Sequence, residues 1–299
     1  MNRLKVIITG GTGLVGKRLT GLLTGKGYQV NILCREPKKP NEFKWNPEEN
    51  YLDEKAFENA TAIIHLAGAN VADERWTDKR KKEIIDSRIK SAQLLYDYLS
   101  KTDHNIESFI SASAVGFYGD RGNELLMEES SNGSGFLAEV CKLWENSADK
   151  MNELKIKVSK VRIGIVLSKN GGALPKLSLP VKFGIGAYMG NGKQFVPWIH
   201  IDDLCDIFIH LLENRNLSGT YNACAPDVKT NKQMSEQIAA ALHRPFIPVP
   251  APAFILKLAM GEMSSMLLMS NNCSSQKIIN TGFVFQYPDL KTTLSSIYT

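Results

Sequence analysis

The stretch Thr9-Gly10-Gly11-Thr12-Gly13-Leu14-Val15-Gly16 joins an apolar run over 4–9 to an amphipathic segment over 14–26. Three of its glycines stand three residues apart, at positions 10, 13 and 16. Glycine allows a tight turn between a strand and a helix, and it lets the backbone approach a phosphate group that the first N–H groups of the helix then bind. A tight turn without a ligand is the alternative, but the predicted strand before the glycines and the predicted helix after them favour a site for the pyrophosphate of a dinucleotide. The predicted contacts are Gly10, Thr12, Gly13, Leu14, Val15 and Gly16.

The N-terminal half of the chain repeats this strand-and-helix pattern. Apolar runs that predict strands alternate with amphipathic segments that predict helices as far as about residue 165. The predicted strands are 4–9, 28–34, 61–66, 107–113 and 156–163, and the predicted helices are 14–26, 76–100 and 135–152. This alternation is typical of βαβ units. It predicts an α/β fold: a Rossmann-type, doubly wound parallel sheet with helices on both faces, joined to a smaller C-terminal substrate domain.

The character of the sequence changes after residue 165. Glycine and proline become frequent from Gly171 to Pro197, which predicts extended chain and loops, and a strand and a helix are expected over 195–213. We interpret the Met- and Leu-rich stretch 254–269 as packing rather than as a lipid or partner site. We therefore predict a dinucleotide-binding domain over 1–165, to which 195–225 returns, and a smaller substrate and C-terminal domain over 166–299.

Composition excludes several classes of protein. At 299 residues, with 43% hydrophobic and 22% charged side chains, the chain has the make-up of a globular protein with a substantial core. The net charge of +5 is mild, and the basic runs 35–39 and 79–82 contain no aromatic side chains that would stack on bases, so we interpret them as solvated surface. Five cysteines without paired spacing indicate neither a disulfide framework nor a zinc site, and we predict no metal site.

The sequence also bears on location and partners. It begins directly with a predicted strand and shows no signal-peptide pattern, and its most apolar late stretch, 253–260, is too short to span a bilayer. We expect a cytoplasmic location, a small-molecule substrate, and no nucleic-acid or membrane partner. The oligomeric state is left open.

The end of the second predicted strand indicates which dinucleotide binds. Enzymes that prefer NAD place a carboxylate there, which accepts hydrogen bonds from the ribose hydroxyls. The chain instead has Cys34 followed by Arg35, and a guanidinium binds a 2′-phosphate that a carboxylate would repel. Glu36 would reach the ribose only in a shifted register. The prediction is NADP, with NAD as the less favoured alternative and with Cys34 and Arg35 in the site.

The run over 61–66 ends in His65-Leu66-Ala67-Gly68. Small residues at the end of a strand let the adenosine side of a dinucleotide pass close to the backbone. Leu66, Ala67 and Gly68 are therefore predicted cofactor contacts. We expect His65 to pack or to form local hydrogen bonds rather than to act in catalysis.

With these pieces in order, the chain resembles the extended short-chain dehydrogenases/reductases, the superfamily of sugar-nucleotide epimerases and dehydratases. It is most similar to an atypical branch, labelled an NAD(P)-dependent epimerase/dehydratase-like family, with a C-terminal domain of unknown function. The resemblance covers essentially the whole chain. It rests on the segments 9–16, 65–68, 111–119 (Ser-Ala-Ser-Ala-Val-Gly-Phe-Tyr-Gly), 198–204 (Trp-Ile-His-Ile-Asp-Asp-Leu) and 282–290 (Gly-Phe-Val-Phe-Gln-Tyr-Pro-Asp-Leu).

The resemblance implies further cofactor contacts. Arg88 stands where the superfamily has an asparagine, and in the atypical branch Arg88 and the preceding Glu83 belong to the cofactor environment; a surface ion pair is the alternative. The segment 164–166 follows the last predicted strand, and in related folds this exit passes the nicotinamide. Val166 is therefore a candidate contact, with a place in a core strand as the alternative.

The chain departs from the superfamily in its catalytic residues. The superfamily uses a Ser or Thr after the fifth strand and a Tyr-x-x-x-Lys pair on the next helix, where the lysine lowers the tyrosine pKa. Ser113 matches the first role, with Ser111 as the alternative in a shifted register. The helix from Gly135 to Glu145 contains no tyrosine, and its Lys142 is preceded four residues earlier by Ala138.

Two Tyr-x-x-x-Lys strings do occur elsewhere, at 51–55 and 287–291, and we interpret both as chance because they fall in the wrong elements. The remaining candidates for proton transfer are Ser113, Glu139, Cys141 and Lys142, of which we favour Ser113 and Glu139. Glu139 would be a general base only if it is partly buried. Cys141 is more simply a core residue, and Lys142 a solvated one.

Two functions remain open at this point. The first is an NADP(H)-dependent oxidoreductase or epimerase-like enzyme that acts on an unknown hydroxyl, carbonyl or nucleotide-sugar compound. The second is an NADP(H)-binding redox sensor or scaffold without catalysis, which the missing tyrosine favours.

Overall fold

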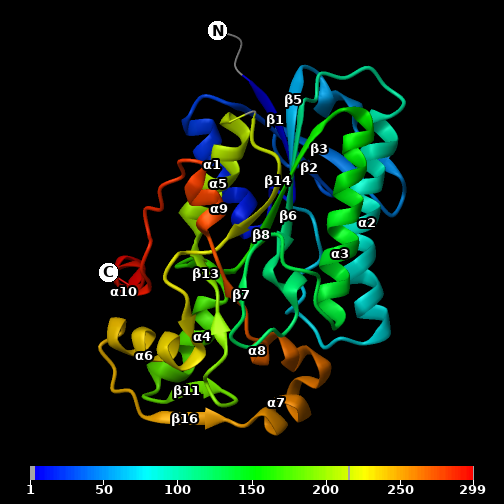
Figure 1. The fold of residues 1–299 in the computed structure, drawn as a ribbon. Helices are drawn as coiled ribbons and strands as arrows, with labels where there is room; N and C mark the ends of the chain where they lie inside the picture. Colours follow the sequence, from blue (N-terminus) through cyan, green and yellow to red (C-terminus); the bar gives the residue numbers. More distant parts are fainter. Residues whose placement is uncertain (1–3, 215, 299) are drawn as a thin grey trace.

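The computed structural model describes residues 4–214 and 216–298, and a mostly parallel sheet runs through it (Figure 1). The sheet has eight strands in the order β14-β8-β6-β5-β1-β2-β3-β4. Their bounds are β1 Lys5–Thr9, β2 Gln29–Cys34, β3 Glu42–Asn46, β4 Tyr51–Leu52, β5 Ala60–His65, β6 Ser108–Ala114, β8 Lys157–Ile163 and β14 Gly219–Ala223. Every neighbouring pair is parallel except β3 with β4, which is antiparallel.

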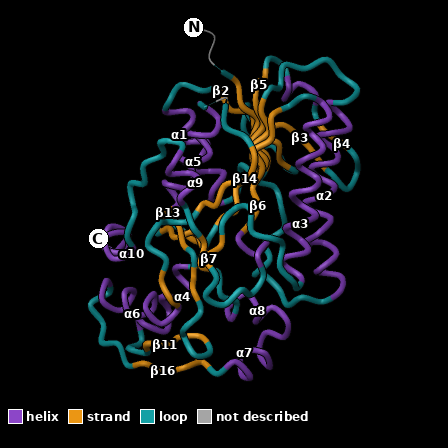
Figure 2. Tube along the Cα trace, in the orientation of Figure 1, coloured by secondary structure: helices purple, strands orange, loops and turns teal. Residues whose placement is uncertain are grey.

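Helices cover both faces of this sheet (Figure 2). On one face, α1 (Leu14–Gly25) and α5 (Ile201–Glu213) pack their leucines against Val6 and Ile8. On the other face, α2 (Asp78–Leu99) and α3 (Phe136–Asp149) pack against Ile7. Successive side chains of a strand point to opposite faces, so β1 serves both cores and reads as one continuous apolar run. The predicted fold class is confirmed.

The predicted strands and helices of the N-terminal half agree closely with the observed ones, but β3 and β4 were not predicted. β3 is short and mixes Glu, Lys and Asn with aromatic residues, and only Trp45 in it is buried. Strands near the edge of a sheet need little apolar sequence because solvent covers part of their surface, so the hydrophobic pattern gives no signal for them.

Residues after β8 build smaller sheets beside the main one. These strands are β9 Ile165–Ser168, β10 Gly171–Gly172, β11 Gly186–Met189, β12 Phe195–Val196, β13 Trp198–His200, β15 Lys229–Thr230 and β16 Pro248–Ala251, while β17 (Asn272–Cys273) pairs with β7 (Leu125–Leu126). The helices are α4 Leu174–Lys182, α6 Asn231–Ala241, α7 Ala253–Met260, α8 Ser265–Leu268, α9 Gln276–Asn280 and α10 Leu290–Tyr298. Side chains of α4, α6 and α10 share one apolar core with Trp198.

Helix α4 corrects the expectation of extended chain and loops over Gly171–Pro197. Pro175 lies in the first turn of the helix, where its missing N–H would have no intrahelical acceptor in any case. Pro180 lies close to the end of the helix, so it removes only one late hydrogen bond. Proline content alone is therefore a poor guide to helix here.

The chain returns to the main sheet after this excursion. Strand β14 pairs with β8, with Tyr221 opposite Val161, and α5 lies beside α1 on the same face of the sheet. The division of the chain at residues 165 and 166 into two domains stays a prediction. Within the described ranges, no helix is long and apolar enough to cross a membrane.

Candidate functional site

Most of the predicted cofactor residues lie at the carboxyl ends of β1, β2 and β5, whereas Glu83 and Arg88 are on α2 and Val166 is on β9. Thr9 pairs with Leu33 on one side and with His65 on the other, so these three strands end at one edge of the sheet. Ligands of open α/β sheets bind outside this edge. The glycine stretch between Thr9 and Leu14 lies there, because it connects β1 to α1.

Steric contacts explain the glycines of this loop. Gly10 has a φ of +68°, and a Cβ there would lie 2.9 Å from the backbone carbonyl of Leu66. A Cβ on Gly16 would lie 2.3 Å from the carbonyl oxygen of Gly10. The loop therefore folds against itself and against the exit of β5 at distances that only glycine allows. The predicted contacts on β1 and β5 are thus neighbours in space.

The start of α1 is open to a ligand. Gly13 is the N-cap residue and supplies no side-chain cap, and the first turn contains no acidic residue. The N–H of Lys17 bonds to the carbonyl of Gly13 at 2.9 Å, so Leu14, Val15 and Gly16 have no intrahelical acceptor for their N–H groups. This end of the helix carries partial positive charge, which favours an anion.

A hydrogen-bond chain holds the exit of β5 in place. The Thr9 hydroxyl accepts the N–H groups of Leu66 and Ala67, each at 3.2 Å, and therefore donates to His65 Nδ1 at 2.8 Å. His65 Nε2 then donates to Ser91 Oγ at 3.2 Å, whose proton goes to the carbonyl of Arg88. Burial lowers the pKa of His65 to about 3, so the ring stays neutral. The prediction of local hydrogen bonds for His65 is confirmed.

Arg88 is a buried cation without an acidic partner among the described residues. Its Nη1 donates to the carbonyls of Ala69 and Ile84, at 3.1 and 2.9 Å, and its guanidinium lies 4.6 Å from the ring centre of Trp144. Its Nε has no hydrogen-bond partner, and a Cβ on Gly68 would lie 3.0 Å from its Cζ. Burial lowers the pKa to about 10, so the side chain is still charged at neutral pH. A buried charge with an orphan donor fits an anionic or strongly accepting ligand.

Glu83 has a different environment from Arg88. Its carboxylate accepts from Arg80 Nη1 at 2.8 Å and is more than half exposed. Arg80 is itself buried, and its Nη2 donates to the carbonyl of Asn70 at 2.5 Å. Arg80 was not predicted as a site residue, since a basic residue inside the run 79–82 gives no signal that sets it apart from solvated lysines.

At the end of β2, Cys34 is buried and Arg35 is exposed. The guanidinium of Arg35 makes no hydrogen bond or ion pair with the described part of the chain. Glu36 is also exposed and lies 3.9 Å from Lys38 Nζ. Arg35 is therefore exposed at the end of β2 without a partner among the described residues, while Glu36 lies near a surface lysine.

Val166 lies on β9 and packs, together with Leu14, Val15 and Leu66, against the core under the glycine loop. Gly171, on the hairpin partner of β9, approaches Leu14: a Cβ there would lie 3.6 Å from Leu14 Cδ1. The structure thus brings Val166 close to the start of α1, although the two are far apart in the sequence. Thr12 is exposed on the loop itself.

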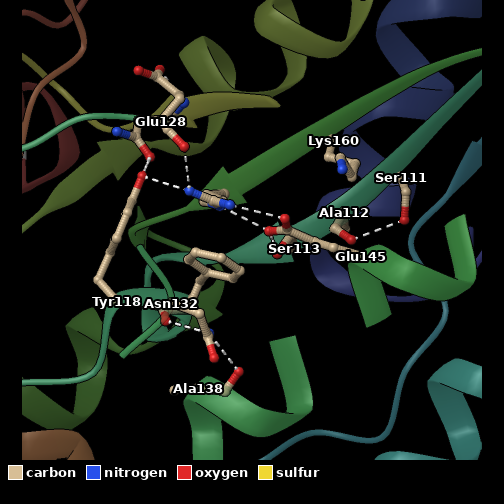
Figure 3. A network of polar contacts seen from close by, with 12 residues as sticks. Ser111, Ala112, Ser113, Tyr118, Glu128, Asn132, Ala138, Glu145 and Lys160 are labelled. Carbon is tan, nitrogen blue, oxygen red and sulfur yellow. Dashed lines mark hydrogen bonds and ion pairs between the residues drawn. The ribbon is translucent and has the colours of Figure 1, made fainter. Parts of the chain in front are cut away.

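Ser113 belongs to a buried polar network (Figure 3). Its hydroxyl donates to Glu145 Oε1 at 2.7 Å, and Arg162 binds the same carboxylate through two bonds of 2.8 and 2.9 Å. Arg162 also donates to Tyr118 Oη at 3.0 Å, and Tyr118 donates to Asn222. Burial raises the pKa of Tyr118, and its hydroxyl proton is already donated to Asn222 Oδ1 at 2.7 Å.

The other candidates for proton transfer lie on α3. Glu139 and Lys142 are exposed, whereas Cys141 is buried, and burial raises the pKa of its thiol to about 12. Cys141 is therefore a core residue. Ser111, the alternative to Ser113, donates to the carbonyl of Ala112 at 3.0 Å.

Two cavities open near the start of α3. One, of about 520 Å³, is lined by Glu139 and Lys142 together with Lys81 and Glu262. The other, of about 450 Å³, lies beside Ala138, where the superfamily tyrosine would be, and has mostly apolar walls that include Phe136, Leu137, Leu268 and Met269. Ser113 lines neither cavity.

The two Tyr-x-x-x-Lys strings lie outside this region of the structure. Tyr51 is on β4, and Tyr287 stacks on His200 with ring centres 3.8 Å apart. His200 caps α5, and the Asp203 carboxylate accepts the N–H groups of Gln286 and Tyr287 at 2.8 and 3.0 Å. The segments 198–204 and 282–290 therefore hold the C-terminal part of the chain against α5.

The sheet, the glycine loop and the open start of α1 define a protein of the Rossmann dinucleotide-fold class. Residues 6–138 match the sequence model of the "NAD dependent epimerase/dehydratase family". Residues 251–297 match the sequence model of the "Domain of unknown function (DUF1731)". The chain belongs to the NAD dependent epimerase/dehydratase family, as the resemblance implied.

Relatives and solved structures agree with this assignment. The chain is 34% identical to the "Epimerase family protein YfhF" of Bacillus subtilis (strain 168), over 98% of each chain. It is 32% identical to the "Epimerase family protein SDR39U1" of Mus musculus, over 98% of this chain and 99% of the mouse protein. The crystal structure of human epimerase family protein SDR39U1 with NADPH superposes with a TM-score of 0.88, at 31% identity and over 99% of both chains.

Proposed function

We propose that the chain binds NADP(H) at the glycine loop and acts as an oxidoreductase or epimerase-like enzyme on a small hydroxyl or carbonyl compound. The observation that carries the cofactor part is the combination of an open helix start with two cations that have no acidic partner among the described residues, Arg35 and Arg88. The NADPH in the human SDR39U1 structure supports the same choice of cofactor.

The residues present fit this cofactor. The N–H groups of Leu14, Val15 and Gly16 would bind the pyrophosphate, because the glycines leave room that any Cβ would fill. Arg35 would bind the 2′-phosphate, and Leu66, Ala67 and Gly68 would lie against the adenosine side. Arg88, with its orphan Nε, would donate to an acceptor of the bound nucleotide, and Glu83 would act by fixing Arg80. Cys34 and Val166 would line the site as apolar contacts.

When bound, the nicotinamide supplies or accepts a hydride. The residues of the chain determine which proton transfers can accompany that chemistry. Ser113 gives its proton to the Glu145 carboxylate, so the hydroxyl offers only lone pairs to a ligand and does not donate. Glu139 is an exposed carboxylate that lines the first cavity together with Glu262, at its rim rather than inside the core.

A binding protein without catalysis is the second candidate. The observation that favours it is Ala138, which replaces a phenol with a methyl group in the wall of an apolar cavity. Without that tyrosine, the site lacks the proton donor that the superfamily uses for a carbonyl oxygen.

Turnover measurements separate the two candidates. NADPH oxidation is followed with a panel of small carbonyl compounds and of nucleotide sugars. The enzyme is expected to reduce small, apolar carbonyls, with rates that drop at least tenfold in Glu139→Gln if Glu139 transfers the proton. Tight NADPH binding without turnover on any compound would instead favour the sensor or scaffold.

The choice of NADP over NAD is tested through thermal stability. A ligand that binds the native state more tightly raises the melting temperature more at equal concentration. NADPH is therefore expected to raise it more than NADH, and Arg35→Asp is expected to reduce or reverse this order. Lys38→Asp, a charge change three residues further along the chain, is the matched control and should leave the order intact. An unchanged order in Arg35→Asp would exclude Arg35 as the phosphate-binding residue.

A further inference from the structure

Helix α7 has an unusual environment for its sequence. It reads Ala-Phe-Ile-Leu-Lys-Leu-Ala-Met, and none of its residues is buried. Helices of this composition ordinarily place apolar side chains in a core. Here Phe254 is 70% exposed and Leu258 81% exposed. The interpretation of 254–269 as packing is therefore wrong for this helix.

Neighbouring segments extend the exposed apolar surface. Strand β16 leads directly into α7 and pairs with β11, and the N–H of Gly186 bonds to the carbonyl of Ile247 at 3.0 Å. These segments lie together along one end of the molecule, at the bottom of Figure 1. We call this surface the apolar end and define it by Phe183, Ile185, Ile247, Val249, Phe254 and Leu258, all of which are exposed.

The segments that form the apolar end contain no carboxylate. The sequence has no Asp or Glu between Glu153 and Asp202, or between Glu236 and Glu262. The two acidic residues nearest to the apolar end along the chain both face lysines: Glu262 pairs with Lys81, and Glu236 lies 3.9 Å from Lys232. Within these segments, the cations therefore have no carboxylate beside them in the chain. The loop that carries Asp73 and Glu74 does reach the end of α7, where Arg75 donates to the carbonyl of Leu258 at 3.0 Å.

The same segments carry exposed cations. Lys182 ends α4, Arg244 precedes β16, and Lys257 lies on α7. No carboxylate in the described parts of the chain pairs with any of the three. Large apolar side chains rimmed by unpaired cations are the composition of a surface that binds an anionic, amphipathic partner.

The positive charge of the apolar end also distinguishes between its possible binding partners. A second copy of this chain, docked through the same surface in a symmetric dimer, would bring cations against cations. Phe254 and Leu258 are 70% and 81% exposed and line neither of the two cavities, although Lys257 also borders the apolar cavity beside Ala138. We propose that the apolar end docks reversibly on a membrane surface that contains anionic phospholipid. Phe254 and Leu258 enter the headgroup layer, and Lys182, Arg244 and Lys257 face the lipid phosphates. This role adds to the proposed cofactor site and does not depend on it.

Vesicle cosedimentation of the full chain tests this proposal. We expect binding to vesicles of equal parts phosphatidylcholine and phosphatidylglycerol, weak binding to phosphatidylcholine alone, and release by salt. The double variant Phe254→Ser/Leu258→Ser should bind at least about tenfold more weakly, since it removes two side chains that enter the lipid. Lys257→Gln should weaken binding about fivefold.

Val284→Ser is the matched control. Val284 is 81% exposed, like Leu258, but lies on the segment that joins α9 to α10. It should bind vesicles like the unaltered chain, and every variant should keep its melting temperature. Equal binding to both vesicle types, or an equal loss in Val284→Ser, would overturn the proposal. Light scattering that shows a dimer which Phe254→Ser/Leu258→Ser dissociates would also overturn it, and would assign the surface to a contact between copies.

Discussion

Glu145→Ala is expected to lower the free energy of unfolding by about 3–5 kcal/mol, because it leaves the buried guanidinium of Arg162 without its carboxylate. Arg162 and Glu145 are both about 95% buried, and two hydrogen bonds join them (Figure 3). The Ser113 hydroxyl loses its acceptor in the same variant. Urea denaturation at neutral pH measures the effect.

Two further variants make this result specific. Asp149→Ala removes the partner of Lys160, an ion pair of similar length whose carboxylate is 43% exposed, and should cost at most about 1 kcal/mol. Glu145→Leu/Arg162→Met replaces both buried charges and should be more stable than Glu145→Ala. If Glu145→Ala lowers the free energy of unfolding no more than Asp149→Ala does, the buried network does not stabilise the fold.

Gly16→Ala is expected to destabilise the chain by about 3 kcal/mol and to abolish the rise in melting temperature that NADPH causes. The added Cβ would lie 2.3 Å from the carbonyl oxygen of Gly10 and 2.6 Å from the Cα of Gly11. Both neighbours are backbone atoms, so the loop has to move away from α1. The N–H groups that would bind the pyrophosphate move with it.

The same helix supplies the control for this variant. A Cβ on Gly21 would meet nothing within 4 Å, so Gly21→Ala should stabilise the chain by about 0.5–1 kcal/mol and leave NADPH binding intact. If Gly16→Ala unfolds, Gly13→Ala provides a milder test, since its Cβ would lie 3.3 Å from the Gly10 oxygen. Similar NADPH binding in all three variants would contradict the assignment of the pyrophosphate site.

The cofactor side of the site was largely readable from the sequence. The roles of Gly10, Gly13 and Gly16 depend on local geometry alone, because a strand, a turn and a helix follow one another directly in the chain. The strand ends at Cys34 and His65 were predictable because parallel strands that alternate with helices must end at one edge of the sheet. The absence of a tyrosine from the helix after Ser113 was also visible, because the order of the elements predicts which helix follows that strand.

The environment of Ser113 could not be predicted from the sequence. Its type and position indicated a catalytic hydroxyl, but its proton belongs to Glu145, thirty-two residues away in the chain. Glu145, on α3, in turn accepts a hydrogen bond from Arg162, which lies on β8. Only the packing of α3 against β6 and β8 places these three groups together, and no local pattern records it.

The sequence by itself determined the fold class, the glycine loop and the lack of a Tyr-x-x-x-Lys pair on α3, since each depends on the order of neighbouring residues. Tertiary structure decided that Arg88 is a buried cation with an orphan donor, that Ser113 donates to Glu145, and that α7 presents its apolar side chains to solvent. These features depend on burial and on partners that are distant in the chain. Hydrophobic periodicity indicates which face of an element is apolar, but it does not specify whether another element covers that face.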